Sequence, residues 1–394
     1  MIFQTLDDKT ECVGTYVDGE IHFDKIPANL TKTWKYSGSI SDPAVEYAWL
    51  YARGQDLTQV CPEGLLKKLN SAQAKFAAYL KTFHIAKVDL REHCFFDLVP
   101  HGFLKTFCEI KNQVTEHVFD TYEKPPNYDH LDGVHRLLHK IKYQSLNLNN
   151  DGCTSLFYNS TDRNRARNII NGPKHVDYNL FGTVTGRLTT KPTSLPILTI
   201  RKDFRKLIKP NNDWFISLDY NGAEIRTFLA LSGHEQPEGD IHAWNIENIF
   251  DNVLTRDEAK SAFFAWLYNF DSEDLSGEYY DRTAILSEYY TDGAVHTPFD
   301  RHIPIDERRA LNYLIQSTTA DIVLQKAVEI DKMLEGRSTF ISHIVHDEIV
   351  LDLKDEDRDL LPSILECFEN TALGEFKANV NAGRDYYELE TLKI

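Results

Sequence analysis

The sequence predicts an α+β fold, in which an antiparallel sheet is combined with long helices. The apolar runs 340–345 and 349–353 are separated by only three residues, which is typical of two antiparallel strands joined by a tight connection. A further apolar run, 215–218, predicts a buried strand. Apolar residues recur at helical spacing over 65–80 and 103–118, which predicts long helices. A chain of 394 residues can form two or three lobes around a large core.

The N-terminal residues 1–55 differ from the rest because they are rich in strand signals. Short strands are predicted over 2–6, 12–17 and 21–23. Asp18-Gly19 is predicted to be the hairpin turn between the last two. A third helix is predicted over 128–146, after the break that Pro125-Pro126 makes.

Two short acidic segments stand where predicted strands end. Asp219 follows the strand 215–218, and His346-Asp347-Glu348 connects the two C-terminal strands. A carboxylate at the end of a buried strand is costly to desolvate and needs a partner. Carboxylates on neighbouring strands repel one another unless divalent cations lie between them, as in a two-metal site for phosphoryl transfer. The alternative for either segment alone is a surface turn.

Residues 255–268 predict a helix with two functional halves. Thr255 and Glu258 have the spacing of a capping box, so the helix should start there. One stripe, at intervals of four residues, consists of Arg256, Lys260, Phe264 and Tyr268. Its cationic half lies near the positive end of the helix dipole and suits a polyphosphate, whereas its aromatic half suits a stacked base. Another face, predicted to pack on the protein, holds Phe263, Trp266 and Leu267. The alternative is an ordinary amphipathic helix.

The charge distribution matters more than the net charge of −17, which by itself would repel a polyanion. Residues 161–210 hold eleven Lys and Arg against three Asp and Glu. This segment immediately precedes the Asp219 strand, so it predicts a basic surface beside the acidic site. We expect that surface to contact a nucleic-acid backbone; the alternative is a solvated loop.

The sequence also limits where the protein acts. No stretch approaches the roughly 18–20 consecutive apolar residues of a membrane span. The N-terminus lacks a basic region followed by an apolar run, so no secretory signal is expected. The six cysteines are scattered without a CxxC pair and are expected to be reduced thiols. We expect a cytoplasmic protein that is not secreted and has no membrane partner.

A succession of short motifs carries a resemblance to a known family. In chain order they are Thr185-Gly186-Arg187, the run from Asp219 to Arg226, Asp240-Ile241-His242, the helix 255–268, the run from Arg308 to Gln316, Ala320-Asp321-Ile322 and His346-Asp347-Glu348. The succession resembles the polymerase domain of family A DNA polymerases, the DNA polymerase I-like group. The resemblance covers 178–353 and depends on the order and spacing of the set, since each motif alone is weak. It implies a right-hand fold with a palm on an antiparallel sheet, helical fingers and a helical thumb.

The resemblance also implies a domain division. The predicted segments are a β-rich N-terminal segment at 1–55, the thumb at 56–160, the first part of the palm at 161–234, the fingers at 235–320 and the second part of the palm at 321–394. The N-terminal segment is too short for a complete 3′-5′ exonuclease, although Asp7, Asp8 and Glu11 lie near its first strand. We interpret it as an exonuclease remnant or a docking module. Such a compact chain resembles phage polymerases, which act in the host cytoplasm.

The family's catalytic roles carry over to matching residues. Asp219 and Asp347 match its two metal-binding carboxylates, and the backbone carbonyl of Tyr220 matches a third ligand; the expected cofactor is a pair of Mg²⁺ ions, with Mn²⁺ as a substitute. Lys260 matches the general acid for pyrophosphate. Glu348 matches an acidic neighbour of the metals.

The resemblance implies a deoxynucleotide as substrate. Glu224 matches the residue that blocks a ribose 2′-hydroxyl. Phe264 matches the residue that packs on the incoming sugar, and a Phe there instead of a Tyr implies discrimination against dideoxynucleotides. Tyr268 matches the aromatic residue that stacks at the templating position. The triphosphate contacts match Arg256, Lys260 and His242.

The implied macromolecular partner is primer–template DNA. The family's contacts with the primer end and the minor groove are matched by Arg187, Asn312, Gln316 and His346. Arg308 matches a helix residue that supports the site. A separate exonuclease or processivity factor is a further partner that this reading allows. The chain departs from the family at Gly222, where a polar residue is usual, and at Phe263, where Asn is usual.

Two other functions stay open on the sequence. A single-subunit RNA polymerase shares the palm, but Glu224 argues against it because such an enzyme must admit the 2′-hydroxyl. A non-catalytic DNA-binding replisome scaffold would have no reason to keep two unpaired acids beside DNA phosphates.

Overall fold

The computed structural model describes residues 1–394 except 7–13, 24, 91, 273–274, 276 and 394. It consists of two compact units, Met1–Tyr143 and Gln144–Ile394. Within the described residues, no helix is both long and apolar enough to cross a membrane. Asp7, Asp8, Glu11 and the start of the predicted strand 12–17 lie outside the described residues.

Three short strands form an antiparallel sheet at the start of the first unit. They are β1 (Phe3–Thr5), β2 (Gly14–Val17) and β3 (Glu20–Phe23), in that spatial order. The predicted turn joins β2 to β3, and both Asp18 (φ 48°) and Gly19 (φ 82°) have the left-handed backbone that a two-residue hairpin requires. A short parallel pair, β4 (Lys32–Thr33) and β5 (Glu46–Tyr47), leads into α1 (Ala48–Tyr51).

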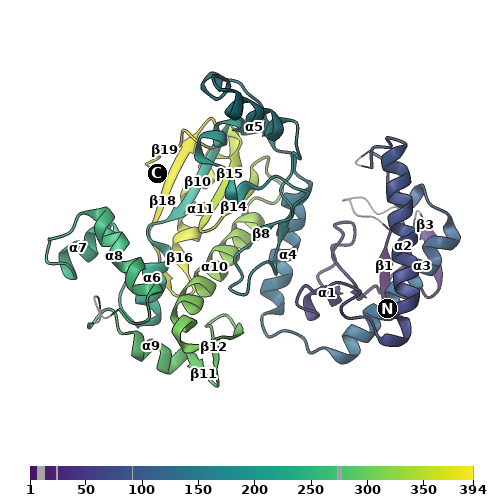
Figure 1. Ribbon diagram of the computed structural model, residues 1–394, viewed down its shortest axis with the longest axis horizontal. Coiled ribbons are helices and arrows are strands. Elements are labelled where there is room, and N and C mark those ends of the chain that lie inside the picture. Colours follow the sequence, from purple (N-terminus) through teal and green to yellow (C-terminus); the bar gives the residue numbers. More distant parts are fainter. Residues whose placement is uncertain (7–13, 24, 91, 273–274, 276, 394) are drawn as a thin grey trace. The chain divides into compact units, whose positions relative to one another are not determined.

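The predicted long helices of this unit are confirmed. They are α2 (Glu63–Ile85), α3 (His101–Thr121) and α4 (Tyr128–Tyr143), with the short turn η1 (Phe95–Asp97) before α3 (Figure 1). One core cluster contains Leu6, Tyr16, Phe95, Val99, Leu104 and Cys108. Strand and helix residues therefore share a core, so the boundary predicted at 55/56 lies inside a compact unit. The compact units divide after Tyr143, and the division into thumb, palm and fingers stays a prediction.

The second unit contains a five-stranded sheet. Its spatial order is β14 (Phe340–Val345), β15 (Glu348–Leu353), β10 (Trp214–Tyr220), β18 (Ala378–Gly383) and β19 (Glu390–Thr391). Every neighbouring pair is antiparallel, which confirms the predicted sheet and its C-terminal hairpin. Since β10 is the central strand, Asp219 near its end lies between partners on both sides.

Helices and short elements complete this unit (Figure 1). The helices are α5 (Ser160–Ile170), α6 (Ala223–Leu231), α7 (Ile241–Asn248), α8 (Arg256–Tyr268), α9 (Arg282–Tyr289), α10 (Glu307–Met333) and α11 (Leu361–Glu369). The short strand pairs are β6 (Asn147–Leu148) with β9 (Ile208–Lys209), β7 (Tyr178–Asn179) with β8 (Thr189–Thr190), and β16 (Asn370–Thr371) with β17 (Gly374–Glu375). A three-stranded sheet is formed by β11 (Tyr290–Thr291), β12 (Ala294–His296) and β13 (His302–Pro304). The short turns are η2 (Thr154–Phe157), η3 (Ile197–Thr199), η4 (Lys202–Leu207) and η5 (Asp355–Leu360).

The inward face of α8 was predicted correctly. Phe263, Trp266 and Leu267 are at most 3% exposed and belong to a core cluster shared with α6 and α10. Phe228 of α6 packs edge-on against Trp266, with ring centroids 5.3 Å apart. This packing fixes the rotation of α8, and so decides which of its residues face outward.

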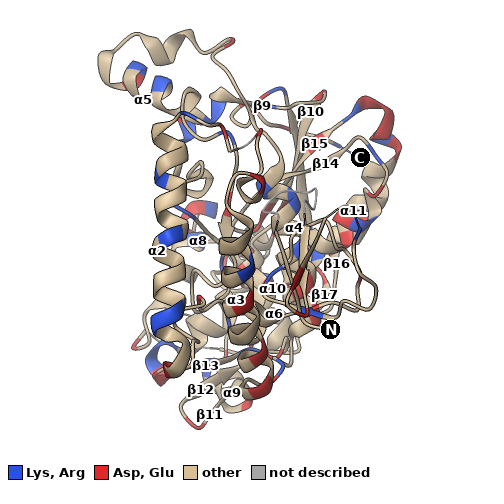
Figure 2. Cartoon of the chain, turned by 90° about the vertical axis from the view of Figure 1, so that its right-hand side faces the viewer, with Lys and Arg blue, Asp and Glu red and all other residues tan. Residues whose placement is uncertain are grey.

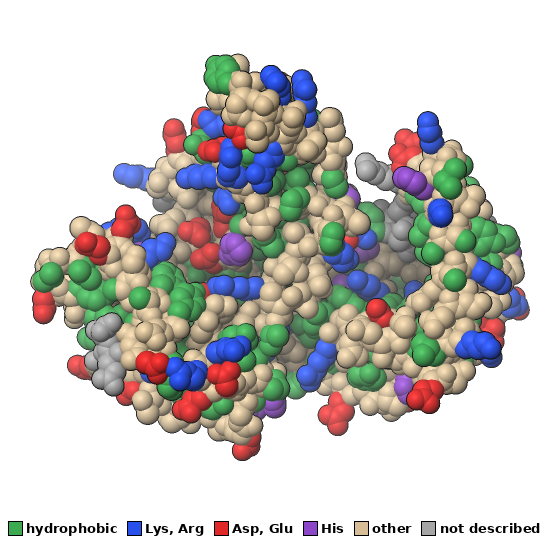
Figure 3. Space-filling model, in the orientation of Figure 1, with side chains coloured by type: hydrophobic (Ala, Val, Ile, Leu, Met, Phe, Trp, Pro, Cys, Tyr) green, Lys and Arg blue, Asp and Glu red, His purple; other side chains and the backbone are tan. Residues whose placement is uncertain are grey.

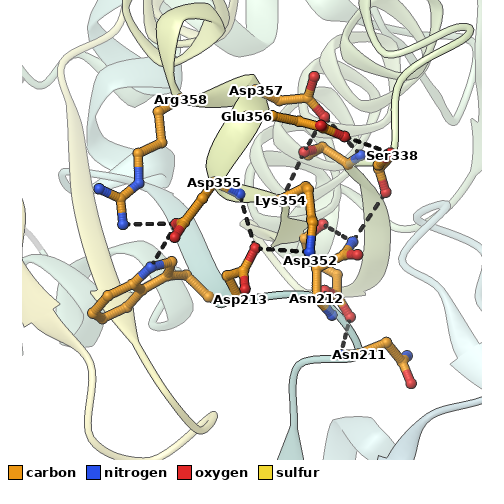
Figure 4. Close-up of polar contacts among 12 residues, drawn as sticks. Asn211, Asn212, Asp213, Ser338, Asp352, Lys354, Asp355, Glu356, Asp357 and Arg358 are labelled. Carbon is orange, nitrogen blue, oxygen red and sulfur yellow. Dashed lines mark hydrogen bonds and ion pairs between the residues drawn. The ribbon is translucent and has the colours of Figure 1, made fainter.

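A polar network holds the start of β10 (Figure 4). Asp352 on β15 is fully buried, and its carboxylate accepts hydrogen bonds from the backbone N–H groups of Asn211 (2.7 Å) and Asn212 (2.8 Å). The Asp213 carboxylate accepts the backbone N–H of Asp355 at 2.9 Å. Because a buried carboxylate without partners is costly, these contacts fix the loop that delivers β10 to the sheet.

Candidate active site

Asp219 and the β14–β15 connection meet at one end of the five-stranded sheet. Asp219 lies directly opposite Glu348 on β15 and Asn379 on β18 in the strand register. His346 and Asp347 alone connect β14 to β15, and His346 has the left-handed backbone (φ 58°) that so short a connection requires. The two predicted carboxylates, Asp219 and Asp347, therefore lie on the central strand and on the hairpin beside it.

The surroundings of Asp219 disfavour its charge. Burial is the largest cause, and the carboxylates of Asp347 and Glu348 add repulsion, so the pKa of Asp219 rises to about 7 although Lys260 and Asn379 act to lower it. Among the residues that the structure describes, no group of three or more His, Cys, Asp or Glu side chains could by itself hold a metal ion. Two carboxylates and a backbone oxygen nevertheless fit Mg²⁺, which commonly keeps waters and substrate phosphates as its other ligands.

Tyr220 and Glu348 are both held by neighbouring residues. The Tyr220 ring stacks on Phe368 (centroids 4.0 Å apart), and its hydroxyl donates to the Phe368 carbonyl at 2.6 Å. The buried Tyr220 side chain is thus anchored to α11, and the backbone carbonyl is the atom left for the predicted metal contact. Glu348 accepts hydrogen bonds from Ser217 (2.6 Å) and Tyr386 (2.7 Å) and does not line the cavity described next.

A cavity of about 500 Å³ opens over the carboxylates of Asp219 and Asp347. Its volume lies within the range of about 300–1,000 Å³ that is usual for ligand pockets. Of the predicted site residues it is lined by Arg187, Asp219, Tyr220, Glu224, His242, Arg256, Lys260, Phe264, Tyr268, His346 and Asp347. In the face drawn in Figure 3, acidic, basic and histidine side chains gather in a hollow of the second unit. The cavity therefore joins groups for cations, anions and aromatic rings.

Helix α8 presents its predicted stripe to this cavity. The capping box is present: Thr255 N donates to Glu258 Oε2 at 2.9 Å, and Glu258 N donates to Thr255 Oγ1 at 3.4 Å. The rings of Phe264 and Tyr268 are nearly parallel, with centroids 5.9 Å apart and planes 15° apart. Tyr268 is 51% exposed, which leaves an aromatic face open to a ligand.

Asp240 organises the side of the cavity that is lined by His242 and Arg256. Its carboxylate caps α7 by accepting the N–H groups of His242 (3.0 Å) and Ala243 (2.9 Å). The same carboxylate accepts from Asn221 (2.8 Å) and pairs with Arg256 (2.8 Å). Burial, followed by the charge of Arg256, lowers the pKa of His242, so this residue favours its neutral form.

Glu224 is the best-buried acid that lines the cavity, at 8% exposed. It forms an ion pair with Arg187, and Tyr268 lies 3.3 Å from its second oxygen. Burial raises the pKa of Glu224 and outweighs the lowering by Arg187. In this structure the predicted sugar-selecting carboxylate is thus bonded to two other predicted site residues.

Three predicted DNA contacts on α10 lie outside the cavity lining. Gln316 donates to Asn312 at 2.6 Å, and it also hydrogen-bonds Tyr268, so this pair borders the aromatic end of the site. Arg308 is 65% exposed and pairs with Asp271 at 2.5 Å. The structure does not bring Arg308 to the cavity.

Sequence reasoning missed several residues of the site. Asn379 lines the cavity and hydrogen-bonds Asp219, but it comes from β18, whose pairing with β10 has no local signal. Asn221 and Asp240 stood in the recognised motifs without an assigned role. Gly222 has φ +69°, and a Cβ there would lie 2.4 Å from Ile241 Cγ2, which explains why this chain has no larger residue at the position.

The comparisons with known proteins agree with the motifs. No family model matches the chain. The thermostable DNA polymerase I of Thermus filiformis is 26% identical over 272 residues, 55% of this chain and 33% of that protein. DNA polymerase I of Chloroflexus aurantiacus is 24% identical over 57% of the chain and 30% of its own length. DNA polymerase I of Lactococcus lactis is 26% identical over 55% of the chain and 31% of its own length. The chain matches about a third of the length of these relatives.

A solved structure matches nearly the whole fold. The POL domain of Pol1 from M. smegmatis, in complex with DNA primer-template and dNTP, has a TM-score of 0.65 and 13% sequence identity. The match covers 98% of this chain and 96% of that one. The fold is that of a DNA polymerase domain. The predicted resemblance to the DNA polymerase I group, and the right-hand polymerase fold that it implied, are confirmed.

Proposed function

We propose that this chain performs template-directed DNA synthesis, adding deoxynucleotides to a primer 3′ end with release of pyrophosphate. The observation that carries the proposal is the composition of one cavity. It combines the acid pair Asp219 and Asp347 with the cations Arg256 and Lys260 and with Glu224. A nuclease would need the acids but not the cationic and aromatic stripe of α8.

Two Mg²⁺ ions, with Mn²⁺ as a substitute, are the cofactor that this donor set fits. Asp219, Asp347 and the carbonyl of Tyr220 would hold them. When bound, such ions neutralise phosphate charge and activate the primer hydroxyl. The burial of Asp219 and its repulsion by Asp347 support this assignment, because a cation offsets that repulsion.

The remaining residues bind and orient the nucleotide. Arg256, Lys260 and His242 line the side of the cavity that receives the triphosphate, where Lys260 can also deliver a proton to pyrophosphate. Phe264 and Glu224 flank the sugar, and Glu224 leaves no room for a 2′-hydroxyl. Such positioning accounts for a large part of the rate of phosphoryl transfer.

The aromatic end of the site receives the template and primer. Tyr268 stacks at the templating position, and Arg187, His346, Asn312 and Gln316 contact the primer end and the minor groove, where acceptor positions are common to all base pairs. Arg308 has a supporting role at a greater distance.

The proposal assigns the thumb to 56–160, the palm to 161–234 and 321–394, and the fingers to 235–320. Lysines recur along α2, the proposed thumb helix (Figure 2), and its acidic residues are limited to Glu63 in the first turn. A groove between α2 and α3 is lined by Lys67, Lys68 and Lys75, which suits a phosphate backbone. Residues 1–55 would serve as a docking module or exonuclease remnant, with proofreading or processivity supplied by a separate chain.

The test is extension of a labelled primer–template with Mg²⁺ and either dNTPs or NTPs. We expect extension with dNTPs alone, and loss of extension with retained DNA binding in Asp347→Ala. The matched control is Asp359→Ala, which removes an exposed carboxylate of η5 and should leave extension unchanged. Extension with NTPs would favour an RNA polymerase, and tight DNA binding without any extension would favour a replisome scaffold.

A further inference from the structure

The turn that carries Arg187 rests on a side chain from a distant part of the sequence. Gly186 has φ +79°, and a Cβ built on it would lie 2.5 Å from a terminal nitrogen of Arg301 and 2.6 Å from its central carbon. The guanidinium of Arg301 is therefore packed against the Gly186 backbone. A Cβ contact under 3.0 Å is essentially never observed, so this position accepts only glycine unless Arg301 moves.

Arg301 is itself held firmly. It donates to both carboxylate oxygens of Asp321, from Nε at 2.6 Å and from a terminal nitrogen at 2.7 Å. The Asp321 side chain is fully buried inside α10, and that of Arg301 is 12% exposed. Bidentate pairs of this kind fix the guanidinium plane as well as its charge. The backbone of Arg301 is also held by Thr297. The Thr297 N–H donates to the Arg301 carbonyl at 3.0 Å, and the Arg301 N–H donates to Thr297 Oγ1 at 3.2 Å.

The turn transmits this position to the cavity. Thr183 closes the turn, because its hydroxyl donates to the Arg187 carbonyl at 2.8 Å and its own carbonyl accepts Gly186 N at 3.3 Å. Arg187 then reaches into the cavity and forms the ion pair with Glu224. The path from α10 to the sugar-selecting carboxylate is thus continuous: Asp321, Arg301, Gly186, Arg187 and Glu224.

We propose that Arg301 and Asp321 are positioning residues that set where Arg187 meets Glu224, and thereby contribute to the choice between deoxyribose and ribose. Neither residue lines the cavity, so the effect passes through the Gly186 turn. The part that concerns sugar choice rests on the proposed function. The part that concerns the Arg187–Glu224 contact does not.

The test uses Gly186→Ala, which would press a methyl group into Arg301. The control is Gly233→Ala, because Gly233 has a similar backbone (φ +73°) with nothing within 4 Å of the added Cβ. The first measurement is a double-mutant cycle of Arg187→Met and Glu224→Gln, in which urea unfolding gives the stability of each variant. A direct contact should couple the two changes by about twofold to 150-fold in the unfolding equilibrium constant.

We expect this coupling in the native chain and in Gly233→Ala, and its loss in Gly186→Ala. Coupling that survives in Gly186→Ala, or that is absent from the native chain, would overturn the positioning role. This measurement needs no enzymatic activity, so it tests the positioning role even if the native chain fails to extend a primer. A failure to extend a primer would refute the proposed function and, with it, the contribution to sugar choice.

The second measurement is the ratio of dNTP to NTP incorporation. A displacement of about 1 Å in a positioning group can cost about 100-fold in rate, so Gly186→Ala should lower dNTP incorporation by up to this factor and reduce the ratio. In a Glu224→Ala background the same change should leave the ratio unaltered. A ratio in Gly186→Ala equal to that of Gly233→Ala would refute the contribution to sugar choice.

Discussion

Removal of the Asp240 carboxylate tests how the side of the cavity around His242 and Arg256 is held together. In Asp240→Ala, α7 loses its N-cap, at a cost of about 1 kcal/mol. Asn221, which is 6% exposed, loses a partner for its amide, at about 1–3 kcal/mol. The Arg256 side chain is 53% exposed, so its ion pair adds only about 0.2–1 kcal/mol. The expected loss of unfolding free energy is about 2–5 kcal/mol.

Two companion variants separate these contributions. Asp240→Asn keeps a cap of equal quality but loses the ion pair and the acceptor for Asn221. Its loss of unfolding free energy should therefore lie between that of Asp240→Ala and that of Arg256→Met. Arg256→Met removes the ion pair alone and should cost less than about 1 kcal/mol. Urea unfolding followed by tryptophan fluorescence measures all three. The reasoning would be refuted if Arg256→Met cost as much as Asp240→Ala, since the ion pair would then dominate.

The same variants carry a pH signature. Burial alone would raise the pKa of Asp240, but hydrogen bonds from Arg256, Asn221 and Ala243 outweigh it and hold the pKa below its usual 3.8. A lowered carboxylate pKa contributes stability above pH 3.8, and this contribution is lost as the pH falls toward the folded-state value. The difference in stability between the native chain and Asp240→Asn should therefore shrink as the pH is lowered below about 4. A constant difference would contradict the assignment.

Three further predictions concern sugar selection and packing. Glu224→Ala should relax discrimination against NTPs by about 10- to 200-fold, the range for one steric contact, and an unchanged ratio would remove Glu224 from the sugar gate. Phe264→Tyr should raise dideoxynucleotide incorporation by about tenfold, the equivalent of one hydrogen bond, in a competition assay; no change would place the register of α8 in question. Gly222→Gln should cost about 2–5 kcal/mol in urea unfolding because the new Cβ meets Ile241 in a left-handed backbone, whereas Gly293→Ala, at φ +74° with open space around it, should cost less.

The parts of the site that follow from local signals were predictable. The start of α8 at Thr255 depends on a capping box within four residues, and its stripe depends on helical spacing alone. The β14–β15 hairpin is equally local, because two apolar runs flank a very short connection. Asp219 and Asp347 were therefore placed on the correct elements.

The remaining parts depend on contacts between distant segments. Asn379 meets Asp219 only because β18 pairs with β10, and no alternation in the sequence specifies that partner. Arg301 and Asp321 form their pair because the β12–β13 turn folds against α10. The core shared by Leu6 and Leu104 is equally non-local, since these residues lie far apart in the chain and no local pattern joins them.

The network around Asp352 has a consequence for engineering at the opposite end of β10. Side chains alternate between the faces of a strand, so a slip of one residue in β10 would turn Asp219 away from the cavity. Asn211 and Asn212, bonded to the buried Asp352, stand where such a slip would begin. Loop grafts or tag insertions at 211–213 should therefore abolish the proposed activity, although they lie at the end of β10 opposite Asp219. Insertions at exposed turns such as Asp292-Gly293 should leave the register of β10 unchanged.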